Sequence, residues 1–111
     1  MVLKTEMKIK IDKSEKRRLP RKFEFPWGKG MISEEASIRC SISGQGFKDT
    51  WEPTIQLLQF DDGEIAVRFC VYGNGRLRRM PLILNNEQAT RLASEIRSNR
   101  KLKLIVGKLL K

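Results

Sequence analysis

The chain has 111 residues and a mass of 12.9 kDa, which suits one domain with one modest core and argues against a second domain. Lys and Arg outnumber Asp and Glu by 23 to 13, and the resulting net charge of +10 favours a polyanionic partner such as nucleic acid or an anionic membrane surface. The chain has no histidine, and no Walker, dinucleotide or Gly-x-Ser-x-Gly motif occurs, so we expect a non-catalytic protein without a metal or cofactor.

Positive charge is concentrated at the two ends of the chain. Residues 1–30 have ten basic and four acidic side chains, residues 31–75 have three and seven, and residues 76–111 have ten and two. No apolar run approaches the roughly 18 residues that cross a bilayer, and the N-terminus lacks a hydrophobic signal core. Cys40 and Cys70 are isolated from each other and form no zinc or redox motif. We therefore expect a cytoplasmic protein without a membrane partner.

The first 30 residues predict a basic N-terminal arm with short extended segments. Residues 7–11 alternate weakly between apolar and polar, and a basic run follows from Lys13 to Lys22. In residues 23–27 three aromatic side chains alternate with other residues, so they either line one exposed side or pack onto a sheet edge. Residues 31–111 are expected to form a single α+β domain that binds nucleic acid.

The middle of the chain predicts a strand over residues 37–42, where Ile38, Cys40 and Ile42 share one face. A glycine-rich turn follows at residues 43–46. Residues 48–53 are polar around Trp51 and end at a proline, so we expect a loop or a strand entry. Trp51 beside Lys48 either stacks on a nucleic-acid base or covers the core.

Residues 55–60 and 65–72 predict a hairpin around Asp61-Asp62-Gly63-Glu64, because Asp and Gly tolerate the positive φ of a tight turn. The second strand has one fully apolar face, which we expect to be buried: Ile65, Val67, Phe69 and Val71. Its other face is expected to point outward: Ala66, Arg68, Cys70 and Tyr72. An exposed arginine and tyrosine on one strand suit phosphate contact and base stacking.

A second turn at Gly73-Asn74-Gly75 precedes a basic third strand over residues 76–84. The strand begins with three arginines near the hairpin tip: Arg76, Arg78 and Arg79. These arginines either contact a polyanion or protect the strand from edge-to-edge aggregation. Pro81 lacks a backbone donor, so the strand lies at an edge or is broken there.

Asn85 and Gln88 have the spacing of a capping box, which predicts a helix that begins at this point. Its apolar residues recur at helical spacing: Ala89, Leu92, Ala93 and Ile96. Apolar periodicity resumes over residues 102–109, so the helix either continues through Ser98 and Asn99 or breaks into a second one. This terminal segment predicts a homodimer through the C-terminal helix.

Residues 55–96 resemble the single-stranded-DNA-binding transcriptional coactivators related to positive cofactor four and, more distantly, the Whirly proteins. The resemblance lies in the order of parts: the strand and turn of residues 60–64, the strand of residues 67–72, the basic residues 76–79, and the closing strand and capped helix from residue 82. The second turn is shorter than in that family, and Pro81 interrupts the next strand.

The resemblance implies a curved antiparallel β-sheet backed by one or two C-terminal helices, a helix-mediated dimer and single strands that cross a basic sheet face. The resemblance implies that the single strand contacts five residues of this chain: Arg68, Tyr72, Arg76, Arg78 and Arg79. With Lys48 and Trp51, these residues are the expected nucleic-acid site, where arginines neutralise phosphates and aromatic rings stack on bases. We expect single-stranded nucleic acid, with DNA favoured over RNA.

Two alternatives remain open from the sequence. The basic face can meet an acidic protein partner, which would make the chain a protein-interaction module. Arg17-x-x-x-Arg21 and the stretch Ser41-Ile42-Ser43-Gly44-Gln45-Gly46 are similar to the motifs of PilZ-type cyclic-dinucleotide receptors, although a serine stands where that family has Asp or Asn.

Overall fold

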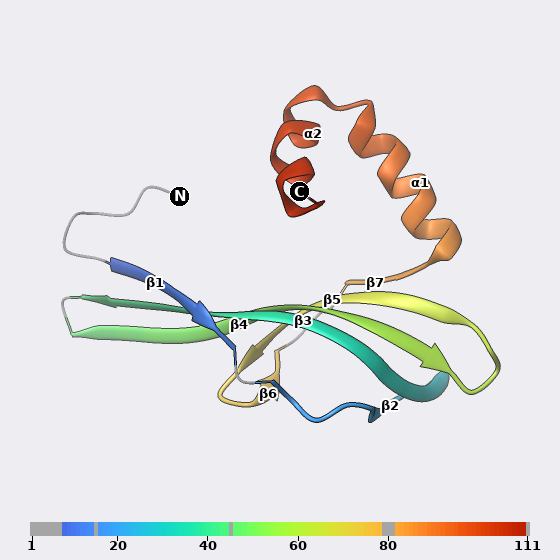
Figure 1. The fold of residues 1–111 in the computed structure, drawn as a ribbon, viewed down its shortest axis with the longest axis horizontal. Helices are drawn as coiled ribbons and strands as arrows, with labels where there is room; N and C mark the ends of the chain where they lie inside the picture. Colours follow the sequence, from blue (N-terminus) through green and yellow to red (C-terminus); the bar gives the residue numbers. More distant parts are fainter. Residues whose placement is uncertain (1–7, 15, 45, 79–81, 111) are drawn as a thin grey trace.

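Residues 8–14, 16–44, 46–78 and 82–110 are described by the structure, which is a computed structural model. They form a seven-stranded antiparallel sheet and two C-terminal helices, which confirms the expected α+β fold (Figure 1). The strand order is β1-β3-β4-β5-β6, with β2 beside β3 and β7 beside β5. The elements are β1 (Lys8–Lys13), β2 (Arg21–Phe25), β3 (Gly28–Gly44), β4 (Phe47–Phe60), β5 (Ile65–Gly73), β6 (Arg76–Leu77), β7 (Leu82–Asn85), α1 (Asn86–Arg97), α2 (Arg100–Val106) and the short 3-10 helix η1 (Gly107–Leu110).

The hairpin of β3 and β4 is much longer than the sequence patterns predict. β3 has 17 residues and β4 has 14, whereas the patterns supported strands only over 37–42 and 55–60. The segment 48–53, expected to be a loop or a strand entry, lies entirely within β4. Pro53 does not interrupt the strand, because it lies in register opposite Val71 and its neighbours on both sides also pair with β5.

A β-bulge at Ser33 divides β3 into two parts. Ile32 lies opposite Leu58, whereas Glu34 lies opposite Leu57, so one extra residue is inserted on β3. The insertion turns Ile32 and Glu35 toward the same face of the sheet, although they are three residues apart. Apolar and acidic side chains therefore reach one face from opposite sides of the bulge.

One face of the sheet, which we call the covered face, is closed by residues 16–25, which we call the strap. Phe23 of the strap packs into the core with Ile32, Leu58 and Ala66. Alternate residues of β4 and β5 are buried on this face: Glu52, Thr54, Gln56, Leu58, Ala66, Arg68, Cys70 and Tyr72. The core is therefore half polar, which requires partners for every buried charge.

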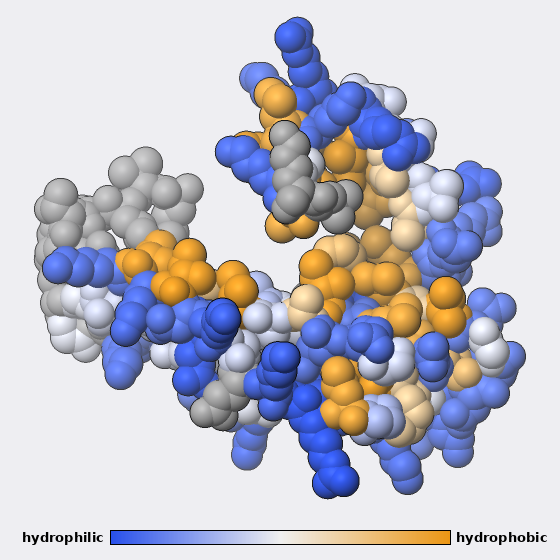
Figure 2. Space-filling model, in the orientation of Figure 1, coloured by the Kyte–Doolittle hydropathy of each residue, from blue (hydrophilic) through white to orange (hydrophobic). Residues whose placement is uncertain are grey.

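The opposite face, which we call the open face, carries the other alternate residues of β4 and β5. Ile55, Ile65 and Phe69 retain 39%, 47% and 38% of their exposure. The helices α1 and α2 lie on this side of the sheet, away from β2, and α1 contacts β5 and β7 (Figure 1). Figure 2 shows apolar surface along the sheet and a hollow between the helices and the β1 end.

The expected orientation of β5 was wrong. The strand buries Ala66, Arg68, Cys70 and Tyr72 and leaves the apolar set on the open face. The physical reason is the strap, which supplies aromatic rings and charged partners to the polar side of β5. No other part of the described chain covers the apolar side to the same degree, since neither α1 nor α2 has a buried residue.

The turns and helix caps agree better with the sequence predictions. Gly63 has φ 93°, and Asn74 and Gly75 have φ 55° and 76°, which are the positive values that tight hairpin turns need. The Asn85 side-chain oxygen accepts a hydrogen bond from the Gln88 N–H at 2.8 Å, and the Gln88 side-chain oxygen accepts one from the Asn85 N–H at 2.9 Å. The predicted capping box is therefore confirmed. The helix α1 ends at Arg97 with Ser98 as its C-cap, and α2 starts after its N-cap, Asn99.

Candidate functional site

Three of the residues predicted to contact nucleic acid gather at one end of the open face. Arg78 reaches from beyond β6 to β4, where its Nη2 donates to Asp49 Oδ1 and to the Thr50 carbonyl oxygen, both at 3.2 Å. Trp51 follows immediately on β4 and is half-buried. Arg76 is exposed and lies in register opposite Gly73 at the end of β5. The fold thus places Arg76, Arg78 and Trp51 at the same end of the open face.

Gly73 makes this arrangement possible because it has no side chain. A Cβ at this position would lie 2.3 Å from Nε of Arg78, so the guanidinium rests directly against the strand. The Arg78 side chain is still 43% exposed, and its ion pair with Asp49 is equally open to water. A surface ion pair of this kind contributes little to stability and leaves the arginine free to exchange partners.

The remaining predicted residues are placed differently. Lys48 is exposed near the tip of the β3–β4 hairpin and, by strand alternation, points to the side opposite Trp51. Arg79 lies outside the described residues. Arg68 and Tyr72 are 4% and 8% exposed beneath the strap, so the prediction that they face solvent was wrong.

Arg68 and Tyr72 are held by Gln56, which sits between them on β4. Arg68 Nε donates to Gln56 Oε1 at 2.7 Å, and Gln56 Nε2 lies 2.8 Å from the Tyr72 hydroxyl oxygen. Arg17 of the strap lies over the Tyr72 ring, 4.0 Å from its centroid. Both residues predicted for phosphate and base contact are therefore parts of the core.

The strap is fixed by ion pairs between its arginines and two buried carboxylates. Arg21 Nη2 lies 2.9 Å from Glu35 Oε2, and Arg17 Nη2 lies 2.8 Å from Glu52 Oε1. Burial alone raises the pKa of Glu35, but hydrogen bonds from Arg21 and Gln56 and the charges of Arg21 and Arg17 outweigh it, so the pKa lies below its ordinary value. Glu35 in turn raises the pKa of Arg21. The strap arginines are thus engaged within the fold.

Cys70 lies in the same buried layer, and burial raises the pKa of its thiol. A thiol of raised pKa is a poor nucleophile at neutral pH, because the thiolate is the reactive form. Cys70 is therefore a packing residue of the covered face.

Sequence reasoning missed two contributions to the open side of the molecule. Phe69 was expected in the core, yet it adds a half-exposed aromatic ring to the open face. The helices carry six exposed basic residues against two acidic ones: Arg91, Arg97, Arg100, Lys101, Lys103 and Lys108, with Glu87 and Glu95. The excess charge of residues 76–111 was the signal for these cations, but their position beside the open face depends on the tertiary fold.

Comparison with protein-family models, with curated proteins and with solved structures gives no match in any of the three. Among the described residues, neither helix has the length and apolar character needed to span a membrane.

Proposed function

We propose that this chain is a non-catalytic, cytoplasmic protein that binds single-stranded nucleic acid on its open face. The observation that carries the proposal is the cluster of Trp51, Arg76 and Arg78 at the edge of an uncovered apolar sheet face, in a chain of net charge +10. A flat apolar surface beside exposed guanidinium groups suits a ligand with both stacking bases and phosphates.

Each part of the proposed site has a separate physical role. Arg76 and Arg78 neutralise phosphates and release counterions, which makes binding depend strongly on salt. Trp51 and Phe69 stack on unpaired bases, and each stacked base contributes about 1–3 kcal/mol. The basic side chains of α1 and α2 extend the positive potential along the same side of the sheet.

The resemblance to the coactivators related to positive cofactor four supports DNA as the preferred ligand. Two of the positions that it carries over, Arg68 and Tyr72, are buried, so the proposal rests on the open face instead. Duplex recognition is not favoured, because the apolar stripe of α1 faces the protein and offers no recognition helix for the major groove.

We also propose that the chain works as a homodimer through its C-terminal helices. The chain exposes 9343 Å² of surface, whereas a compact monomer of its mass exposes about 6,300 Å². Leu102, Ile105 and Leu109 recur along the terminal segment and are 49%, 64% and 69% exposed. A second copy of the same stripe would cover them in a two-fold contact.

The nucleic-acid proposal is tested by fluorescence anisotropy with labelled single-stranded DNA, single-stranded RNA and duplex DNA over a salt series. We expect single strands to bind more tightly than duplex. The double variant Arg76→Ala/Arg78→Ala should bind single strands at least tenfold more weakly and lower the slope of log K against log salt by about 1.4, which corresponds to two phosphate contacts.

The matched control is Lys16→Ala/Lys22→Ala, which removes the same charge from exposed positions of the strap, on the other side of the sheet. It should retain most of the affinity. Equal losses in both double variants would mean that only net charge matters and would refute the site. Pull-downs that survive nuclease treatment, together with weak binding to all three nucleic acids, would instead support the acidic protein partner.

The structure does not favour a PilZ-type receptor, because both arginines of the similar motif already have partners. The guanidinium groups of Arg17 and Arg21 are already paired with Glu52 and Glu35.

A further inference from the structure

One end of the sheet extends beyond the strap as a three-stranded arm (Figure 1). The arm consists of β1, residues 38–43 of β3 and residues 48–51 of β4. On the side of the open face it carries apolar residues such as Ile9, Ile11 and Trp51. The opposite side, which we call the polar arm face, continues the covered face beyond the strap. Figure 2 shows apolar surface on the side of the arm toward the helices and hydrophilic surface on the side away from them.

The strand register places the side chains of the polar arm face in rows across the three strands. Directly opposite side chains lie about 5 Å apart, and alternate residues of one strand lie about 7 Å apart. Two complete rows therefore cover an area of about 10 Å by 7 Å in which hydroxyl groups lie beside ammonium groups. In the order β1, β3, β4, the rows are Lys8, Ser43 and Lys48, and Lys10, Ser41 and Thr50.

The cations of the polar arm face are exposed and mostly unpaired. Lys8, Arg39 and Lys48 take part in no salt bridge within the described part of the chain. Lys10 Nζ lies 3.8 Å from Asp12 Oδ2, but both side chains are more than half exposed, so this pair contributes little. Asp12 is the one acidic side chain among the described residues of this face. Four cations thus share a small surface with a single carboxylate.

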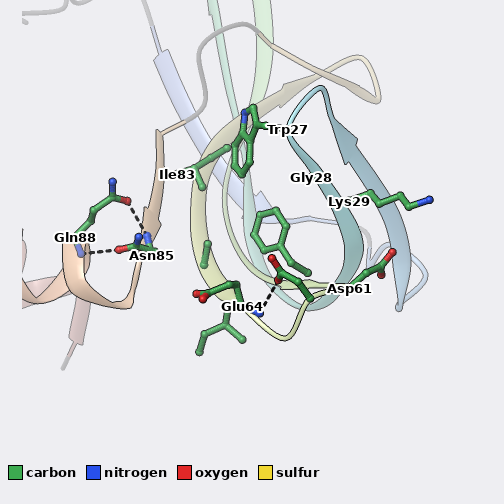
Figure 3. Close-up of a pocket in the computed structure, with 12 residues that line it drawn as sticks. Trp27, Gly28, Lys29, Asp61, Glu64, Ile83, Asn85 and Gln88 are labelled. Atoms are coloured by element: carbon green, nitrogen blue, oxygen red, sulfur yellow. Dashed lines mark hydrogen bonds between the residues drawn. The ribbon is translucent and has the colours of Figure 1, made fainter.

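The other end of the sheet has the opposite charge. The β4–β5 turn carries Asp61, Asp62 and Glu64, and Figure 3 shows the carboxylates of Asp61 and Glu64 on opposite sides of this turn. Lys29, the one basic residue among the described residues that line the pocket beside the turn, extends away from the cavity (Figure 3). The charge distribution along the sheet therefore directs an anion toward the arm.

We propose that the polar arm face binds a linear chain of phosphates without contacting bases. Lysine and arginine side chains neutralise successive phosphates, and the hydroxyl groups beside them donate hydrogen bonds to phosphate oxygens. No aromatic ring lies on this face among the described residues, so a base finds no stacking partner there. The phosphate chain belongs either to a nucleic-acid backbone or to inorganic polyphosphate. This site goes beyond the proposed function, because it needs no unpaired base and no residue of the open face.

The test is a titration followed by ¹H–¹⁵N NMR, with the backbone N–H groups of Ser41 and Ser43 as reporters. The probes are inorganic polyphosphate, a short blunt-ended duplex DNA, and orthophosphate as the single-phosphate control. The indole N–H of Trp27, at the other end of the sheet, is an internal control. We expect saturable shifts at both reporters with polyphosphate, and an affinity at least about tenfold lower for orthophosphate, because one phosphate meets fewer cations.

The variant Lys8→Gln/Lys48→Gln removes the two cations of the first row. It should weaken polyphosphate binding about tenfold and lower the slope of log K against log salt by about 1.4, the value for two contacts to a single chain. Lys8→Arg/Lys48→Arg keeps both charges and should retain the affinity to within about twofold. The matched control is Lys16→Gln/Lys22→Gln, which removes the same charge from exposed positions of the strap and should bind nearly as the unaltered protein does.

Duplex DNA that shifts the same reporters would identify a nucleic-acid backbone as the source, whereas shifts with polyphosphate alone would identify the inorganic polymer; both support the proposed chemistry. Equal losses in the first variant and the strap control would overturn it, as would shifts that do not saturate or an unchanged affinity of the first variant. Arg76→Ala/Arg78→Ala should leave polyphosphate binding unchanged. The polar arm face and the open face can therefore fail independently of each other.

Discussion

Gly30 lies where the backbones of β3 and β4 approach each other closely. A Cβ at this position would lie 2.0 Å from the Gln59 carbonyl oxygen and 2.7 Å from the Phe60 Cα. Both neighbours belong to the main chain of β4, so no side-chain rotation can make room. The sheet can form between β3 and β4 at this point only with glycine.

We predict that Gly30→Ala lowers the free energy of unfolding by about 3 kcal/mol, because the strands must separate locally and the adjoining aromatic cluster must repack. Urea denaturation followed by circular dichroism measures this change.

Gly107→Ala is the control, since a Cβ there meets nothing within 4 Å and the backbone is helical. It should raise stability by about 0.5 kcal/mol. Equal stability of the unaltered protein and Gly30→Ala would contradict the close approach.

At the scale of elements, the strap decides which face of the sheet is buried. The sequence predicted the hairpin turns, the capping box and the C-terminal helices, because each depends on residues close together in the chain. It could not predict the orientation of β5, because Arg68 and Tyr72 are contacted by Phe25 and Arg17 of the strap, which are distant in sequence. A rule that buries the more apolar face fails when another segment neutralises the polar one.

The sequence likewise predicted only part of the candidate site. Arg76, Arg78 and Trp51 were predicted from local charge and composition, and the fold places them at one end of the open face. Phe69 was missed because its apolar strand pattern is typical of a core. Its exposure arises because no element in the described part of the chain covers it fully, which no local pattern encodes.

The ion pairs between strap and sheet predict a dependence of stability on pH. The pKa of Glu35 is lowered in the folded protein, so the stabilisation is complete at neutral pH. It begins to fall as the pH drops through the unfolded glutamate pKa of about 4.3 and is lost below the folded pKa. Thermal denaturation between pH 7 and pH 3 should therefore show a steeper loss of stability in the unaltered protein than in Glu35→Gln.

Glu24→Gln is the matched control for this experiment, because Glu24 lies on β2 and its side chain is exposed. Its stability should follow the curve of the unaltered protein. If Glu35→Gln also ran parallel to the unaltered protein, the carboxylate would not stabilise the strap through its charge.

At the scale of the whole molecule, the two proposed assemblies respond to salt in opposite ways. Each copy carries a net charge of +10, so salt screens the repulsion between two copies and strengthens a dimer. Nucleic-acid binding weakens as salt rises, because the release of counterions into a more concentrated salt solution gains less entropy. The oligomeric state and the affinity for single strands can therefore be separated within one salt series.

We predict that size-exclusion chromatography with light scattering gives twice the 12.9 kDa chain mass, and that Ile105→Glu returns it to one chain. The added charge would lie within the apolar stripe of the helix contact. Ser94→Glu adds the same charge to the exposed side of α1 and should remain dimeric. A single-chain mass for the unaltered protein at every salt concentration would dispose of the dimer.

The bulge at Ser33 has a consequence for how β3 tolerates changes in length. Ile32, Ile38, Cys40 and Ile42 all occupy even positions, yet the first serves the covered face and the others the open face, because one inserted residue changes the phase of the strand. Deletion of Ser33 would remove the extra residue and leave Ile32 and Glu35 two positions apart, so a regular strand could still hold both on the covered face. Loss of a residue elsewhere in β3 would instead turn one part of the strand over, because the side-chain period is two.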